Sequence, residues 1–309
     1  MFYTKEEIRK DLGIAINEST IKKEIETILT GLLDKMGLYY RCFSRLKSPE
    51  SIEKKLKIKN YTTDRRMQDI FGVRIVLYYR DDVNIVLKQI EKNFDVVDIA
   101  RNVSLAEKFS SEKLNIVCRF PQNMESISSK DFFEKYNIDT TFEIQIRTVF
   151  SEGWHEVEHD MRYKCEDSWK EYEDYLRVLY GIFATLNTCD WAMVKLFSDL
   201  AHDNYKSGQW DDMIRNKFRI KMKDGKLSEN IKTLFDEDHE LAKAIYRYDR
   251  ERLMDILYNM RFKFSLTADT IVQLINLDID ASEKLKEKTN ATLREKFVQS
   301  IQQARKSGL

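Results

Sequence analysis

The chain has 309 residues, of which 42% are apolar and 12% aromatic, and its 52 basic residues balance 52 acidic ones. This composition can form a sizeable core and excludes a disordered chain. A net charge of zero gives no global attraction to nucleic acid or anionic membranes. No apolar run could span a bilayer, the N-terminus is too charged for a signal peptide, and no CxxC pair occurs. We therefore expect a cytoplasmic protein with reduced thiols and no membrane role.

The first predicted elements are helices. Residues 1–40 are expected to form a helical segment, because the apolar positions from Ile21 to Met36 fall at helical spacing. A second helix is predicted to start at Ser48 and to end near Lys59. Ser48 can cap it, Pro49 suits its first turn, and Glu50 suits the positive end of the helix dipole.

Strands and helices alternate in the next part of the chain. The pattern predicts a helix at 82–92 and strands at 71–79, 94–100, 114–120 and 140–147. In the last strand every second residue is apolar. Its apolar face carries Phe142, Ile144 and Ile146, and its polar face carries Glu143, Gln145 and Arg147.

No strand is predicted after about residue 165. Helical spacing recurs at 172–200, 241–257, 267–277 and 282–304. The sequence thus predicts an α/β (α+β) protein with three parts: a helical segment at 1–40, an α/β core at 41–165 and a helical region at 166–309.

Three polar clusters suggest chemistry. At Arg45–Ser51, cations and a serine precede a helix start, where free backbone N–H groups can bind phosphate. A capped helix beside solvated basic residues is the alternative. At Asp69–Ile75, an acid precedes a strand and Gly72 allows close approach of a ligand. A surface aspartate and a bulge glycine would give the same pattern.

The third cluster is Glu143–Thr148. If its polar face lines a cleft, Glu143 and Asp69 could together bind Mg²⁺, and Arg147 could neutralise phosphate charge. Two carboxylates from different strands beside basic residues fit phosphoryl transfer, in which positioning and charge neutralisation supply most of the catalysis.

Together these clusters resemble the synthetase domain of the RelA/SpoT family. The resemblance rests on four motifs in order: SRLKSPESIEKKL, DIFGVRI, EIQIRT and WHEVEHDMRYK, which begin at Ser44, Asp69, Glu143 and Trp154. It implies a nucleotidyltransferase-like mixed β-sheet flanked by helices. It also implies an alarmone-synthesising enzyme of the stringent response, which moves the β,γ-pyrophosphate of ATP to the 3′-hydroxyl of GTP or GDP.

The resemblance also implies roles for particular residues. Arg45 and Arg74 would sandwich the adenine of ATP. Asp69 would ligate Mg²⁺, and Glu143 would share that ion or activate the acceptor hydroxyl. The ATP phosphates would be held by Lys47, Ser48, Ser51 and Lys55. The phosphate and acceptor region would include Gln145, Arg147 and His159.

The acceptor half departs from the family pattern. The family carries a Gly-Tyr-Arg-Ser-x-His signature whose tyrosine stacks on the acceptor guanine. The corresponding stretch here, residues 110–115, has no aromatic residue, and Glu112 replaces the arginine. A lost stacking ring costs about 1–3 kcal/mol. Phe109 or Tyr136 could substitute for the ring, and the acceptor is not expected to be specifically a guanosine nucleotide.

The sequence also allows other functions. The acceptor could be the 3′ end of tRNA, or the chain could be a regulatory pseudoenzyme that binds nucleotide without turnover. His155-Glu156-Val157-Glu158-His159 satisfies the HExxH zinc-protease motif, although it follows a strand and no long helix precedes it. The helical region suggests ordinary packing or a homo-oligomer contact.

Overall fold

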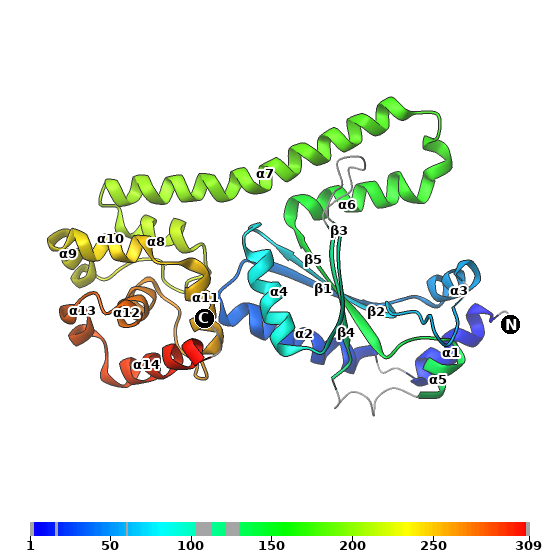
Figure 1. Ribbon diagram of the computed structural model, residues 1–309, viewed down its shortest axis with the longest axis horizontal. Helices are drawn as coiled ribbons and strands as arrows, with labels where there is room; N and C mark the ends of the chain where they lie inside the picture. The colour runs from blue at the N-terminus through cyan, green and yellow to red at the C-terminus, as the bar shows by residue number, and fades with distance from the viewer. Residues whose placement is uncertain (1–2, 16–17, 60, 103–112, 122–129, 307–309) are drawn as a thin grey trace. The chain divides into compact units, whose positions relative to one another are not determined.

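The computed structural model describes residues 3–15, 18–59, 61–102, 113–121 and 130–306 (Figure 1). The chain divides into two units. Unit 1 comprises residues 1–30 and 40–190, and unit 2 comprises residues 31–39 and 191–309. Within the described ranges, none of the helices combines the length and the apolar character needed to cross a membrane.

Unit 1 is built on a five-stranded sheet. The strands are β1 (Tyr40–Leu46), β2 (Phe71–Leu77), β3 (Val96–Asn102), β4 (Lys113–Arg119) and β5 (Thr141–Thr148). Their order across the sheet is β1-β2-β5-β4-β3. The β2–β5 pair is parallel and the other pairs are antiparallel, so the sheet is mixed, and the predicted α/β class is confirmed.

Helices flank this sheet (Figure 1). Those of unit 1 are α1 (Lys5–Ala15), α2 (Glu18–Lys35, which continues into unit 2), α3 (Pro49–Ile58), α4 (Asp82–Asn93), α5 (Lys130–Lys135), α6 (Val149–Met161), a 3₁₀ helix (Tyr163–Trp169) and the first part of α7 (Glu173–Lys206). The predicted helices near 21–36, 48–59, 82–92 and 172–200 are confirmed.

The core of unit 1 lies against one face of the sheet. Phe142, Ile144 and Ile146 are at most 2% exposed, as the alternation of β5 predicts. Phe94, which follows α4, meets Phe142 edge-on with ring centroids 5.7 Å apart. Burial of such side chains stabilises the unit by roughly 1.5–3 kcal/mol each. The opposite face of the sheet is therefore left for polar residues.

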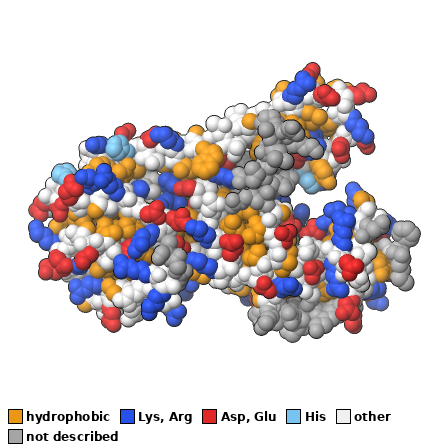
Figure 2. All heavy atoms as spheres, viewed as in Figure 1, with side chains coloured by type: hydrophobic (Ala, Val, Ile, Leu, Met, Phe, Trp, Pro, Cys, Tyr) orange, Lys and Arg blue, Asp and Glu red, His pale blue; other side chains and the backbone are white. Residues whose placement is uncertain are grey.

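Unit 2 is helical in its described part. After the end of α7, its helices are α8 (Trp210–Phe218), α9 (Glu229–Glu237), α10 (His239–Arg247), α11 (Arg250–Asn259), α12 (Ala268–Ile279), α13 (Glu283–Lys288) and α14 (Ala291–Lys306). Acidic and basic side chains are interspersed over the face shown in Figure 2, as expected from balanced charge.

Two predicted helices of this region are wrong in extent. The stretch 241–257 is split into α10 and α11, because the Asp249 side chain accepts from Arg252 N at 2.7 Å and starts a new helix. The stretch 282–304 is split into α13 and α14. There the Asn290 side chain accepts from the backbone N–H groups of Thr292 and Leu293. In both places a side-chain cap competes with continuation of the helix.

Candidate active site

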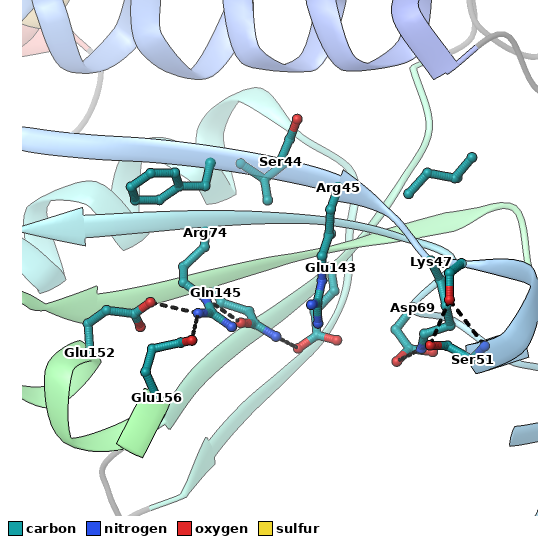
Figure 3. Close-up of a pocket in the computed structure, with 15 residues that line it drawn as sticks. Ser44, Arg45, Lys47, Ser51, Asp69, Arg74, Glu143, Gln145, Glu152 and Glu156 are labelled. Carbon is teal, nitrogen blue, oxygen red and sulfur yellow. Dashed lines mark hydrogen bonds and ion pairs between the residues drawn. The ribbon is translucent and has the colours of Figure 1, made fainter. Parts of the chain in front are cut away.

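The polar face of the sheet carries a row of three residues from adjacent strands. Arg45 on β1 pairs with Gly72 on β2, and Gly72 pairs with Glu143 on β5. A Cβ atom at Gly72 would have only one neighbour within 4 Å, the carbonyl oxygen of Glu143 at 4.0 Å. The missing side chain leaves the space between Arg45 and Glu143 open. Figure 3 shows the two side chains on the same face of the sheet, with Arg45 beside Glu143.

This space belongs to a cavity of about 520 Å³, a size typical of small-molecule sites. It brings together residues of all three predicted clusters. The lining residues are Phe43, Ser44, Arg45, Leu46, Lys47, Ser48, Ser51, Asp69, Gly72, Val73, Arg74, Glu143, Gln145, Glu152 and Glu156. Basic groups, a helix start and carboxylates therefore share one cavity.

The start of α3 forms one end of the cavity. Ser48 caps the helix by accepting from Ser51 N at 3.3 Å, and its hydroxyl donates to Ser51 Oγ at 3.0 Å. Pro49 takes the first helical position, as predicted. The positive end of the α3 dipole, the serine hydroxyls and the ammonium of Lys47 make this end suitable for phosphate.

Asp69 forms ion pairs with two lysines at the same end. The ammonium groups of Lys47 and Lys55 both donate to Asp69 Oδ2. The side chains of Lys47, Lys55 and Asp69 are 15%, 28% and 28% exposed. Asp69 Oδ1 is buried and accepts no hydrogen bond within the described residues. One oxygen of this carboxylate is therefore occupied and the other is available to a ligand.

The pKa values follow from this arrangement. Burial alone would raise the pKa of Asp69, but attraction and hydrogen bonds from the two lysines outweigh it and lower the pKa. Burial lowers the pKa of Lys47 to about 8 despite Asp69. Burial also opposes the charge of Lys55, but this side chain is more exposed, and its bond to Asp69 raises its pKa.

The other end of the cavity is built around Arg74. Its Nη1 donates to Glu152 Oε1 at 2.6 Å and also to Glu156, both on α6. Its Nε donates to Gln145 Oε1 at 3.1 Å. Burial alone would lower the pKa of Arg74. The hydrogen bond and attraction from Glu152 outweigh burial, and the pKa lies above its ordinary value. These bonds lie at the guanidinium edges and leave the planar face able to stack on a base.

Arg147 does not line the cavity. It is 2% exposed, and its Nη2 donates to Asn115 Oδ1 at 3.0 Å. Burial and the nearby Arg74 lower the pKa of Arg147 to about 10, against the attraction of Glu152 and Glu143. It therefore remains a buried cation, and it could act on a ligand in the cavity only through its electric field.

The histidines of α6 also lie outside the cavity wall. His159 Nδ1 lies 2.9 Å from Asp160 Oδ1, and its ring stacks on Tyr163. The rings of His155 and His159 are 5.9 Å apart. Glu156, the glutamate of the HExxH pattern, is instead paired with Arg74.

The carboxylates of the cavity suit a magnesium ion. Asp69 has its buried Oδ1 available, and Glu143 lies on the wall of the same cavity. Mg²⁺ is usually held by one or two carboxylates, with waters and substrate phosphates completing its shell. In the part of the chain that the structure describes, no group of three or more His, Cys, Asp and Glu residues could hold a metal by itself. The donor set fits an ion that is bound together with its substrate.

The acceptor residues are only partly described. Phe109 and residues 110–112 lie outside the described ranges. The suggestion that Tyr136 supplies a stacking ring is wrong. Its side chain is 0% exposed, and its hydroxyl donates to Asp11 Oδ2 at 2.8 Å. A ring held in the core cannot stack on an acceptor base.

Sequence reasoning missed several lining residues. Phe43 and Ser44 lie on β1, which was not predicted as a strand. Glu152 was not singled out, and Glu156 was considered only as part of a zinc motif. Their spacing of four residues on the helix that follows β5 was the available signal, because it places both on one helix face.

Comparison with known proteins agrees with the predicted resemblance. Residues 44–168 match the family model described as the region found in RelA / SpoT proteins. Over 124 residues the chain is 31% identical to GTP pyrophosphokinase YjbM of Bacillus subtilis (strain 168). This matched stretch covers 39% of this chain and 54% of that protein. The chain thus spans about half the length of the curated relative that it matches.

Solved structures are similar as well. The small alarmone synthetase 1 from Bacillus subtilis shares 25% identity with a TM-score of 0.45, over 58% of this chain and 88% of that one. The same synthetase bound to its product pppGpp shares 24% identity with a TM-score of 0.47, over 58% and 92% of the two chains.

Proposed function

We propose that this chain, whose residues 44–168 are a RelA/SpoT region, is an ATP-dependent pyrophosphokinase. It would transfer the β,γ-pyrophosphate of ATP to the 3′-hydroxyl of a nucleotide acceptor. The observation that carries the proposal is the single cavity that holds a phosphate-binding helix start, Asp69 and Glu143 together. Phosphoryl-type transfer needs charge neutralisation and positioning more than covalent chemistry, and this set of groups provides both.

The donor nucleotide would span the cavity. Arg45 and the open face of Arg74 are suited to the adenine, since guanidinium groups stack on aromatic rings. Lys47, the Ser51 hydroxyl and the positive end of the α3 dipole are suited to the phosphates. Mg²⁺, held by Asp69 and Glu143, would supply positive charge against the triphosphate.

The transfer itself uses few protein groups. The 3′-hydroxyl oxygen of the acceptor would form a bond to the β-phosphorus of ATP, while the bond from that phosphorus to the α,β-bridging oxygen breaks and AMP leaves. The hydroxyl proton would pass to Glu143, whose Oε1 already accepts from Gln145 Nε2 at 3.0 Å. Lys47, at the phosphate end, would offset the charge on the phosphates during transfer.

A transfer assay tests the proposal. Purified chain with Mg²⁺ and γ-labelled ATP is offered GTP, GDP, ATP or bulk tRNA in separate reactions. We expect a labelled 3′-pyrophosphorylated product, and the reaction that yields it identifies the acceptor. Labelled tRNA would favour a macromolecular acceptor. ATP binding without transfer to any acceptor would contradict the proposal and favour a regulatory pseudoenzyme.

The Glu143→Gln variant tests the assigned proton acceptor. It preserves shape but removes the basic oxygen, so transfer should fall at least 100-fold, as expected for loss of general-base catalysis, while ATP binding remains within a few-fold. The control is Glu91→Gln at an exposed position of α4, which should leave both unchanged. Full activity in Glu143→Gln would disprove the assignment.

A further inference from the structure

A continuous chain of hydrogen bonds among residues that line the cavity connects α6 to Glu143 (Figure 3). Glu152 and Glu156 accept from Arg74 Nη1, the first at 2.6 Å. Arg74 Nε donates to Gln145 Oε1 at 3.1 Å, and Gln145 Nε2 donates to Glu143 Oε1 at 3.0 Å. The connection starts on α6, crosses β2 and ends on β5.

The two ends of this connection fix the orientation of the amide in its middle. A guanidinium only donates and a carboxylate only accepts, so Gln145 must turn its oxygen to Arg74 and its NH₂ to Glu143. The NH₂ group occupies Glu143 Oε1. Within the described residues no hydrogen bond engages Oε2. One oxygen of Glu143 is held still while the other is left for a substrate hydroxyl.

The carboxylates of α6 also keep the charge of Arg74 away from Glu143. Arg74 is the register partner of Gln145, and Glu143 is the next residue on the same face of β5. Without Glu152 and Glu156, Glu143 would be the nearest carboxylate on this polar face to which the guanidinium could turn. That pairing would displace Gln145 and occupy the oxygen needed by the substrate. Glu152, 17% exposed against 58% for Glu156, should hold Arg74 more strongly.

We propose that Glu152 and Glu156 are positioning residues for Glu143. They hold Arg74, Arg74 orients Gln145, and Gln145 presents the Glu143 carboxylate with one oxygen free. This inference rests on the proposed function, since it takes Glu143 as the proton acceptor. It assigns the α6 acids mainly an effect on the rate of transfer, with a smaller effect on the affinity for ATP because Arg74 also stacks on the adenine in the proposed function.

The test is the double variant Glu152→Ala/Glu156→Ala, with Glu171→Ala/Glu173→Ala at the exposed start of α7 as a control of equal charge change. We expect kcat to fall at least tenfold in the first, with a smaller rise in KM for ATP, and neither to change in the second. Alanine favours helix, so α6 should persist, and circular dichroism checks this.

A second variant tests the middle of the connection, at Gln145. Gln145→Leu interrupts the connection at its centre and should lower kcat by a similar factor. Combining it with the double variant should lower kcat little further, because both changes break the same connection. An active wild type with unchanged kcat in the double variant, or with a raised KM alone, would overturn the inference. A wild type without any transfer would instead refute the proposed function, and the inference with it.

Discussion

The ion pairs between Asp69 and the two lysines can be tested with the substitution Asp69→Asn. It keeps the shape of the side chain and removes the charge shared by Lys47 and Lys55. All three side chains are less than one-third exposed. Exposed ion pairs contribute about 0.2–1 kcal/mol, whereas breaking a fully buried pair costs about 3–5 kcal/mol. This intermediate burial predicts a loss of about 1–3 kcal/mol from the free energy of unfolding of unit 1.

The loss should depend on pH in a defined direction. The folded-state pKa of Asp69 lies below its ordinary value of 3.8. The contribution of ionised Asp69 to the free energy of unfolding is therefore fully present at pH values above its ordinary pKa. It disappears as the pH falls through the lower pKa of the folded state. Wild type and Asp69→Asn should differ in stability at pH 6 to 8 and converge below about pH 4.

Hydrogen exchange of the β2 and β5 amides is the suitable assay, because it reports the opening of unit 1 separately from that of unit 2. Asp160→Asn is the control. It removes exposed contacts to Lys164 and His159, with the Asp160 and Lys164 side chains both 57% exposed, and should cost at most about 0.5 kcal/mol. If Asp69→Asn costs no more than this control, burial does not strengthen the Asp69 pairs. Transfer by Asp69→Asn should be lost in either case, because the substitution removes the carboxylate that is proposed to bind Mg²⁺.

Two further predictions concern Lys47 and unit 2. Burial lowers the pKa of Lys47 to about 8, so its protonated, phosphate-binding form is lost as pH rises through 8. ATP affinity measured by calorimetry should fall roughly tenfold from pH 8 to 9.5 in wild type. It should stay flat in Lys47→Arg, since arginine remains charged, and equal slopes would contradict the lowered pKa. In unit 2 the Asp278 side chain is fully buried and accepts from Tyr248, Arg252 and Arg305. Because the two arginines are 35% and 54% exposed, Asp278→Asn should destabilise the unit by about 1–3 kcal/mol in urea unfolding. Asp199→Asn, an exposed pair partner, should change stability little, and equal effects of the two variants would contradict this reasoning.

The sequence predicted those parts of the site whose signal is local. The start of α3 follows from Ser48, Pro49 and Glu50 without any tertiary contact. The two faces of β5 follow from strict alternation, and Glu143 and Gln145 lie on the polar face as predicted. Such elements are predictable because one periodicity or one cap determines them.

Other elements depend on partners far along the chain. β1 is an edge strand with no fully buried residue, so its alternation carries little hydrophobic signal. Arg147 has the same sequence periodicity as Glu143, yet it lies buried against Asn115, because β4 packs beside β5. The pairing of Arg74 with Glu152 joins residues 78 positions apart and has no local pattern.

The path of the chain through the two units has a consequence for synthesis and truncation. Residues 31–39 belong to unit 2, although the rest of that unit begins at Trp191. Leu33, Met36 and Leu38 in this short segment are at most 2% exposed, and Gly37 O accepts from Lys221 N at 2.7 Å. Residues 40–190 of unit 1 thus separate the two pieces of unit 2, and the helices that follow Trp191 must be synthesised before unit 2 can close around its first piece. A chain cut after Asp190 would carry those apolar side chains without their covering helices, and we expect it to aggregate.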